Sequence, residues 1–138
     1  MIRTSERVAP IKGDVFIVED DSILRPLLGD ILKDISITSM AFTTAEDALA
    51  YALRSNRRCG LLIADHGLPG RIKGIELAGI FRKNWPDIPV IITSGYELKP
   101  TRLPEGVAYL QKPWSVDTLI STVADVTDPS KTIRGIQS

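Results

Sequence analysis

The sequence predicts one α/β domain built on a doubly wound, five-stranded parallel sheet. Short apolar runs alternate five times along the 138 residues with segments of helical periodicity. Apolar runs of this length suit strands that are buried on both faces, as the strands of a parallel sheet are. Because parallel neighbours need crossover connections, the helices between them must cover both faces of the sheet.

Length and composition are typical of a single globular domain and argue against several other classes of protein. A chain of 138 residues with 43% hydrophobic and 25% charged residues can form one domain with a core. Its formal net charge is zero, so we expect no nucleic-acid partner and no binding to a membrane surface. The single cysteine, Cys59, excludes an internal disulfide and fits a cytoplasmic location. No apolar run approaches the length of a membrane-spanning helix.

Apolar runs place the strands. They are expected over Asp14–Val18, over Ile35–Phe42 at an edge of the sheet, over Leu61–Asp65 at its centre, over Ile88–Ile92 and over Val107–Leu110. Asn56–Gly60 is expected to form the turn into the central strand. The central strand must end at Asp65, because an ionised carboxylate is costly inside a core.

Capping residues and helical periodicity place the helices. They are expected from a Ser22 cap to about Asp34, from Thr44 onward, from Gly74 to about Asn84, and from a Ser115 cap onward. Two prolines, Pro100 and Pro104, argue against a long regular helix over Glu97–Gly106. We expect residues 1–12 to be a flexible arm, residues 13–126 to be the domain, and residues 127–138 to be a fraying tail.

Polar residues follow four of the predicted strands. Glu19, Asp20 and Asp21 follow the first strand, Asp65 ends the third, Thr93 follows the fourth and Lys112 follows the fifth. The carboxyl ends of parallel strands meet at one edge of a sheet, where such folds bind ligands. Three adjacent acids repel one another, so a strand end that carries them is expected to hold a cation.

Together these residues describe a site that accepts a phosphoryl group. Asp20 and Asp65 can share Mg²⁺, while one oxygen of Asp65 acts as the nucleophile. Thr93 can donate a hydrogen bond to a phosphoryl oxygen, and Lys112 supplies a positive charge. His66, the one histidine of the sequence, is expected to be a loop residue. Little therefore favours a zinc site or a Cys–His nucleophile.

Each of these residues also has a plainer interpretation. Asp65 could open a turn, Asp21 or Ser22 could cap the first helix, Thr93 could cap a loop, and Lys112 could lie on the surface before a turn. Two other functions stay open at this point. One is a Mg²⁺-dependent phosphohydrolase with an aspartate nucleophile, although the length leaves no room for a substrate cap. The other is a docking module that works without phosphate.

Four short motifs resemble the receiver domain of two-component response regulators, the chemotaxis-regulator fold. They are Val18-Glu19-Asp20-Asp21, Ala64-Asp65 followed by Leu68-Pro69, Ile92-Thr93-Ser94, and Tyr109-Leu110-Gln111-Lys112-Pro113. The resemblance covers about Lys12 to Val126. It implies the flavodoxin-like strand order 2-1-3-4-5 and a histidine kinase or histidine phosphotransfer protein as the phosphoryl donor. It also implies signalling by protein–protein contact, with no enzymatic activity beyond self-phosphorylation and autodephosphorylation.

The resemblance also implies a role for each site residue. Asp65 would be the phosphoacceptor and Lys112 would bind the phosphoryl group. Asp20, Asp65 and the backbone carbonyl of Gly67 would bind Mg²⁺, with Glu19 acting through water. Thr93 would be the switch hydroxyl and Tyr109 the aromatic switch residue. The Lys112–Pro113 peptide bond would be cis.

The chain departs from this family in two segments. The loop Pro69–Gly74 is one residue longer than usual and carries Lys73 where an acid is common. The segment between Thr93 and Lys112 is shorter and rich in proline, so we expect the fourth helix to be short or missing. That helix contributes to a dimerisation face in the family, and we therefore expect a monomer or a weak dimer. Residues 127–138 are too few for an output module, so a complete chain would be a stand-alone receiver.

Overall fold

The computed structural model describes residues 8–55, 59–95 and 103–128 of the chain. Its strands are β1 (Asp14–Val18), β2 (Ser39–Phe42), β3 (Cys59–Asp65), β4 (Val90–Ser94) and β5 (Val107–Gln111). Its helices are α1 (Leu24–Asp34), α2 (Ala45–Arg54), α3 (Gly74–Asn84) and α4 (Val116–Thr127). All strand pairs are parallel, and the strand order is β2-β1-β3-β4-β5. The predicted fold class and strand order are therefore confirmed.

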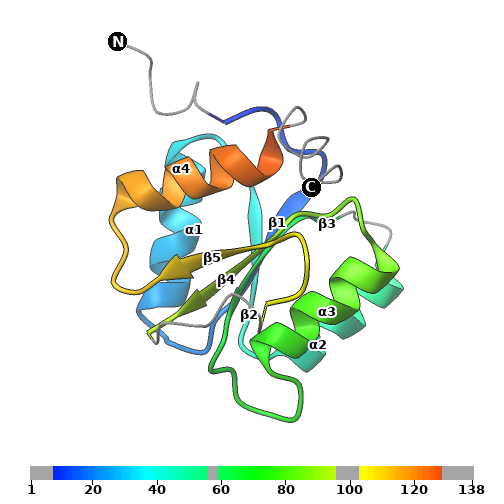
Figure 1. Ribbon diagram of the computed structural model, residues 1–138. Coiled ribbons are helices and arrows are strands. Elements are labelled where there is room, and N and C mark those ends of the chain that lie inside the picture. The colour runs from blue at the N-terminus through cyan, green and yellow to red at the C-terminus, as the bar shows by residue number, and fades with distance from the viewer. Residues whose placement is uncertain (1–7, 56–58, 96–102, 129–138) are drawn as a thin grey trace.

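The helices form one layer on each face of the sheet. Helices α1 and α4 cover one face, and α2 and α3 cover the other (Figure 1). Side chains of β1 alternate between the two layers, because successive residues of a strand point to opposite faces. Phe16 packs toward α2 and α3, whereas Val15 and Ile17 pack toward α1 and α4. The central strands are thus buried on both faces, as their apolar sequences predict.

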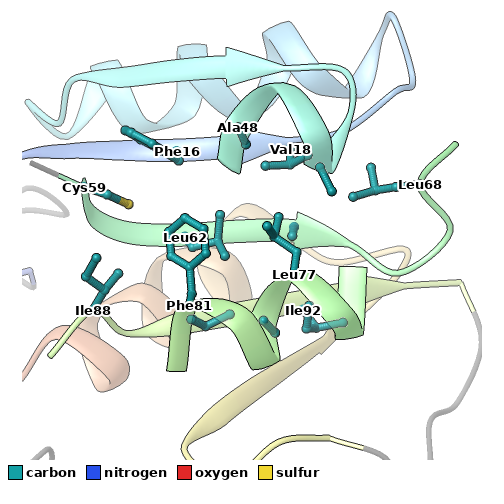
Figure 2. Close-up of a cluster of buried hydrophobic side chains, with 14 residues drawn as sticks. Phe16, Val18, Ala48, Cys59, Leu62, Leu68, Leu77, Phe81, Ile88 and Ile92 are labelled. Carbon is teal, nitrogen blue, oxygen red and sulfur yellow. The ribbon is translucent and has the colours of Figure 1, made fainter. Parts of the chain in front are cut away.

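One cluster of buried apolar side chains fills the layer between the sheet and helices α2 and α3. Figure 2 shows Leu77 and Phe81 of α3 beside Leu62 of β3, with Phe16 of β1 nearby. Leu62, Leu77 and Phe81 are fully buried. Full burial of each such side chain stabilises the fold by about 1.5–3 kcal/mol relative to exposure. This packing holds the carboxyl ends of the strands in register and so positions the site.

The predicted start of β2 was wrong. Strand β2 begins at Ser39 and not at Ile35, because the preceding residues close the end of α1. The N–H groups of Ile35 and Ile37 donate to the carbonyl of Leu32, and Ser36 adopts a φ of 65°. These bonds satisfy carbonyl groups that the end of a helix leaves unpaired. β2 does lie at an edge of the sheet, as predicted.

The cap of α1 is one of the two candidates that the sequence offered, Asp21 and Ser22. Asp21, and not Ser22, accepts hydrogen bonds from the N–H groups of Ile23 and Leu24, at 2.8 and 2.9 Å. A short carboxylate one turn ahead of a helix satisfies the first unpaired N–H groups. The other two predicted caps are confirmed, since Thr44 accepts from the N–H of Asp47 and Ser115 from that of Thr118.

Three further strands have boundaries that differ slightly from the predicted ones. β3 begins at Cys59, inside the predicted turn 56–60, of which residues 56–58 lie outside the described residues. β4 starts two residues later than predicted and extends through Thr93 and Ser94, and β5 extends to Gln111. At the amino end of β3, a Cβ on Gly60 would lie 2.7 Å from the carbonyl oxygen of Lys12, so the chain crosses β3 closely there. Two residues of the predicted arm, Val8 and Ile11, pack against the α1–α4 core.

The segment between β4 and β5 is described only in part. Residues 103–106 form a turn and not a helix. The prediction of a short or missing fourth helix falls largely on residues 96–102, which lie outside the described residues. Among the residues that the structure describes, α4 is the last helix and follows β5 directly. Within the described ranges, no helix is long and apolar enough to cross a membrane.

Candidate functional site at the carboxyl edge of the sheet

The strand ends bring the predicted residues together. In the register of the sheet, Asp65 of β3 lies directly beside Thr93 of β4. Val18 at the end of β1 lies beside Ala64, so the acids that follow β1 reach the same edge. One carboxylate oxygen from each of Glu19, Asp20 and Asp65 lies within 4.8 Å of the others. The tertiary structure thus forms the acidic cluster that the strand-end pattern predicts.

Asp65 is a buried carboxylate, only 8% exposed, with a partner at each oxygen. The Lys112 Nζ lies 2.8 Å from Oδ1, and the Gly67 N–H donates to Oδ2 over 3.1 Å. Both contacts are charge-assisted, which makes them stronger than neutral hydrogen bonds. They hold the carboxylate at the mouth of the site, beside Thr93.

Lys112 bridges two carboxylates. Its Nζ lies 2.8 Å from Oε1 of Glu19 as well as 2.8 Å from Oδ1 of Asp65. Burial acts to lower the pKa of Lys112, but the hydrogen bonds to Asp65 and Glu19 outweigh it and raise that pKa above its usual value. The lysine therefore stays charged and offsets the two buried negative charges.

Glu19 is more deeply buried than Asp65, at 2% exposure. Its Oε2 accepts a hydrogen bond from the Asp21 N–H at 3.2 Å. Burial raises the pKa of Glu19 above its usual value, while the hydrogen bond from Lys112 opposes this shift. The buried charge of Glu19 therefore costs free energy, and its ion pair with Lys112 is the main contact that offsets this cost.

Adjacent acids Asp20 and Asp21 have different surroundings. Asp20 belongs to the acidic cluster, and the Arg25 Nη1 donates to the carbonyl groups of Glu19 and Asp20 at 3.0 and 3.3 Å. Asp21 instead caps α1, and the hydrogen bonds from Leu24 and Ile23 lower the pKa of Asp21. The structure thus separates a carboxylate of the site from a carboxylate of the helix cap.

The hydroxyl side of the site comes from β4. Thr93 is 2% exposed, and its carbonyl accepts the N–H of His66 at 2.8 Å. The Lys112 N–H donates to the Ser94 carbonyl at 2.7 Å, which ties β5 to the end of β4. The Lys112–Pro113 bond is cis, as the resemblance implied. Tyr109 is half-buried and pairs with Ile92, one position before Thr93 in the register.

Two contacts of the segment between β3 and α3 were not predicted from the sequence. A Cβ on Gly74 would collide with the carbonyl group of Asp65, so only glycine allows α3 to begin so close to β3. Glu46 of α2 accepts the N–H of Arg71 at 2.9 Å. The glycine at the start of α3 is a visible signal in the sequence, whereas no local pattern indicates the Glu46 contact.

The donor chemistry of the cluster fits Mg²⁺. Glu19, Asp20 and Asp65 supply hard carboxylate oxygens from two strand ends, and Mg²⁺ binds proteins through one or two carboxylates together with carbonyls and water. Asp20 is exposed, so water has access to one side of the cluster. The described cluster contains no histidine or thiolate, the ligands that zinc sites favour.

A doubly wound parallel sheet with acids, a threonine and a lysine at its carboxyl edge defines a class of signalling domains that receive phosphoryl groups. The chain belongs to the response regulator receiver domain family, which matches residues 15–124. Receiver domains are regulatory modules, and the resemblance inferred from the four motifs is confirmed.

Individual relatives agree with this assignment. The nitrogen assimilation regulatory protein NtrX of Azorhizobium caulinodans is 30% identical over 112 residues, which are 78% of this chain and 24% of that protein. The response regulator protein FleR of Pseudomonas aeruginosa is 33% identical over 114 residues, 80% of this chain and 24% of that protein. The crystal structure of NtrX from Brucella abortus superposes with a TM-score of 0.75 at 27% identity, covering 91% of this chain and 29% of that chain. The chain thus spans about a quarter of the length of these curated relatives.

Proposed function

We propose that Asp65 accepts a phosphoryl group from a histidine kinase or a histidine phosphotransfer protein, with Mg²⁺ bound beside it. The phosphorylated domain, residues 13–126, then signals by protein–protein contact. The observation that carries this proposal is the pairing of the buried Asp65 carboxylate with the Lys112 Nζ at 2.8 Å, inside the acidic cluster. A cation placed there can bind the phosphoryl oxygens once Asp65 is modified.

The chemical step is a transfer between two nucleophiles. One carboxylate oxygen of Asp65 forms a bond to phosphorus as the bond from phosphorus to the imidazole nitrogen of the donor breaks. The imidazole leaves with the bonding electron pair and takes up a proton, and the product on this chain is an acyl phosphate. Lys112 then exchanges its contact with Asp65 for contacts with phosphoryl oxygens, which carry more negative charge than the carboxylate did.

Asp20, Asp65 and the carbonyl of Gly67 would hold Mg²⁺, and Glu19 would act through water. When bound, Mg²⁺ withdraws charge from the phosphoryl group during transfer. Gly67 lies next to the acidic cluster, since its N–H donates to Asp65 at 3.1 Å. Arg25 holds the backbone of Glu19 and Asp20 from the other side of the site.

Thr93 and Tyr109 would carry the signal away from Asp65. A phosphoryl group adds nearly two negative charges and three acceptor oxygens. The Thr93 hydroxyl lies on the adjacent strand, at the register position of Asp65, and would turn to donate to one of these oxygens. Tyr109 on β5 would then move into the space beside β4, and a partner would recognise the surface from Gly95 to Tyr109. Residues 96–102 of that surface lie outside the described residues.

We infer in addition that the domain works in the cytoplasm as a monomer or weak dimer, without nucleic acid or membrane as partner. The equal numbers of acidic and basic residues, 17 each, support the absence of a polyanionic partner. Analytical ultracentrifugation with and without beryllofluoride would measure the oligomeric state.

The phosphoacceptor can be tested by mass spectrometry of the intact protein after incubation with Mg²⁺ and acetyl phosphate. We expect one added phosphoryl group on the wild type, none on Asp65→Asn, and one on the control Asp87→Asn, an exposed acid on the turn before β4. A phosphoryl group on Asp65→Asn would refute the assignment. Release of phosphate from unrelated esters would instead indicate a phosphohydrolase, and an inert wild type would indicate a docking module.

A further inference from the structure

The loop between β3 and α3, residues 66–73, borders the site next to Asp65. Its first part includes Gly67, whose N–H contacts Asp65, and Leu68, whose side chain is fully buried in the core below α2 and α3. The rest of the loop contains Pro69 and Gly70, which are exposed. A glycine-containing loop loses much conformational entropy when it is ordered, so contacts that hold it have a large influence on its position.

Glu46 contacts this loop from a different part of the chain. It lies in the first turn of α2, whose start is fixed by the Thr44 cap. Its Oε2 accepts the N–H of Arg71 at 2.9 Å, across a separation of 25 residues in sequence. This hydrogen bond lowers the pKa of Glu46, so the carboxylate is charged at neutral pH and the bond is charge-assisted.

The loop is shaped to receive this carboxylate. Gly70 has a φ of +90°, and a Cβ at this position would lie 2.6 Å from Oε2 of Glu46. The backbone conformation therefore favours a glycine, and a side chain at this position would also displace the Glu46 carboxylate. On the other side of the loop, the Lys73 Nζ donates to the carbonyl of Leu68 at 2.8 Å. Two charged side chains thus hold the loop at Leu68 and Arg71.

We propose that Glu46 is a positioning residue of the phosphoryl-acceptor site, which acts by anchoring the β3–α3 loop at the Arg71 N–H and so holding Gly67 against Asp65. The inference rests on the proposed function, because it assigns to Glu46 a role in that reaction. Glu46 touches neither Asp65 nor the proposed metal ligands in the described contacts, and its effect is transmitted through the loop backbone. The longer loop of this chain is thereby held in one arrangement by a side chain from α2.

Substitution of Glu46 tests this role with a matched control. In Glu46→Ala we expect Mg²⁺ affinity, measured by calorimetric titration, to fall about tenfold, the lower end of the effect of residues that support metal ligands. Phosphoryl uptake from acetyl phosphate should slow in parallel. In Glu46→Gln the amide oxygen can still accept from Arg71, and we expect partial recovery of both quantities. The control Asp47→Ala removes an exposed acid from the same helical turn and should behave as the wild type.

Amide hydrogen exchange provides a readout that does not depend on metal or phosphate. The Arg71 N–H should exchange faster in Glu46→Ala than in the wild type or in Asp47→Ala, while amides of β3 keep their protection. Gly70→Ala should push the loop away from an intact Glu46 and produce the same losses. The double variant Glu46→Ala/Gly70→Ala should lose less than the sum of the two single variants, because both disrupt the contact of Glu46 with the loop, while the strain at a φ of +90° belongs to Gly70→Ala alone.

The outcomes separate this inference from the proposed function. If the wild type takes up neither Mg²⁺ nor a phosphoryl group, the proposed function fails. If the wild type takes up both and Glu46→Ala does so equally well, the positioning role of Glu46 is refuted. The role is refuted as well if Arg71 exchange is unchanged in Glu46→Ala, or if the losses of the two single variants add fully.

Discussion

The buried polar groups at the two ends of the β-sheet have different partners. At the carboxyl edge, the buried carboxylates Glu19 and Asp65 share one lysine and lie beside a threonine. At the amino edge, the buried Asp14 accepts a hydrogen bond from the Thr38 hydroxyl at 2.8 Å. Burial raises the pKa of the nearby Cys59 thiol to about 12, which keeps the thiol neutral. The carboxyl edge therefore clusters two buried carboxylates around a lysine, whereas the amino edge holds one buried carboxylate beside a hydroxyl.

The cavities at the amino edge also distinguish it from the carboxyl edge. The amino edge has two open cavities of about 170 and 280 Å³; Ile11 lines both, and Lys12 and Asp87 are the charged residues that line the smaller one. No cluster of titratable groups comparable to the one at the carboxyl edge faces them within the described residues. Packing of like charges costs stability, and a fold retains such an arrangement where function requires it. We therefore expect substitutions at the carboxyl edge to affect function and substitutions at the amino edge to affect stability alone.

The largest effect should come from Lys112→Ala, which removes the cation that two buried carboxylates share. Because Lys112 is partly exposed, we expect a loss of about 1–3 kcal/mol in the free energy of unfolding at neutral pH, below the full cost of breaking a buried pair. The loss should shrink under acid conditions, because the raised pKa of Glu19 lets that carboxylate take up a proton. Phosphoryl uptake should fall about 100-fold. Urea denaturation measures the loss of stability, and intact-mass measurements follow phosphoryl uptake. Lys83→Ala, which removes an exposed lysine, is the control. Equal behaviour of the two variants would contradict the arrangement in which Glu19 and Asp65 share Lys112.

Mg²⁺ affinity should separate Asp20 from Asp21. Asp20→Ala removes a member of the acidic cluster, and we expect affinity to fall by about tenfold or more, as for the loss of a carboxylate ligand. Asp21→Ala removes the cap of α1 and should reduce helix stability with little change in Mg²⁺ affinity. Metal titration followed by tryptophan fluorescence measures both affinities; Trp114 lies two residues after Lys112, and Trp85 is the other tryptophan of the chain. Equal affinities in the two variants would show that the acids are not divided in this way.

Glu19→Gln should reveal the cost of the buried charge. A raised pKa means that the folded chain binds the Glu19 proton more tightly than the unfolded chain does. Stability due to this group is thus complete below the ordinary value of 4.5 and is lost as pH rises through the raised pKa. Glu19→Gln should therefore stabilise the fold at pH 7 by up to about 1 kcal/mol and show no gain well below pH 4.5. Unfolding curves at pH 7 and well below pH 4.5 check this. If Glu19→Gln were less stable than the wild type at pH 7, the charge of Glu19 would stabilise the fold and not destabilise it.

The smallest effect on function should come from the amino edge. Thr38→Val removes the hydroxyl that donates to Asp14 and should lower stability by about 1 kcal/mol. Because Thr38 lies at the opposite end of the sheet, Mg²⁺ affinity and phosphoryl uptake should stay at wild-type values. A change in either quantity would mean that the two edges are coupled and would remove the basis of the comparison.

The sequence by itself determined the elements and the edge at which the site forms. Hydrophobic periodicity is a local property, so β1, β4 and the helices could be located within a few residues from short windows. The parallel topology then requires the carboxyl ends of the strands to meet, and this brings Asp20, Asp65, Thr93 and Lys112 to one edge. The four motifs at these strand ends were specific enough to indicate the receiver family.

Only the tertiary structure decided how these residues divide their contacts. Asp21 and Ser22 are both good caps, and the geometry of the chain at the end of β1 selected Asp21. The start of β2 depended on how α1 closes at Ser36, and the contact of Glu46 with Arg71 joins residues 25 positions apart. Such contacts depend on which side chains can reach one another after the helices pack on the sheet, and a pattern confined to a short stretch of sequence carries no information about that reach.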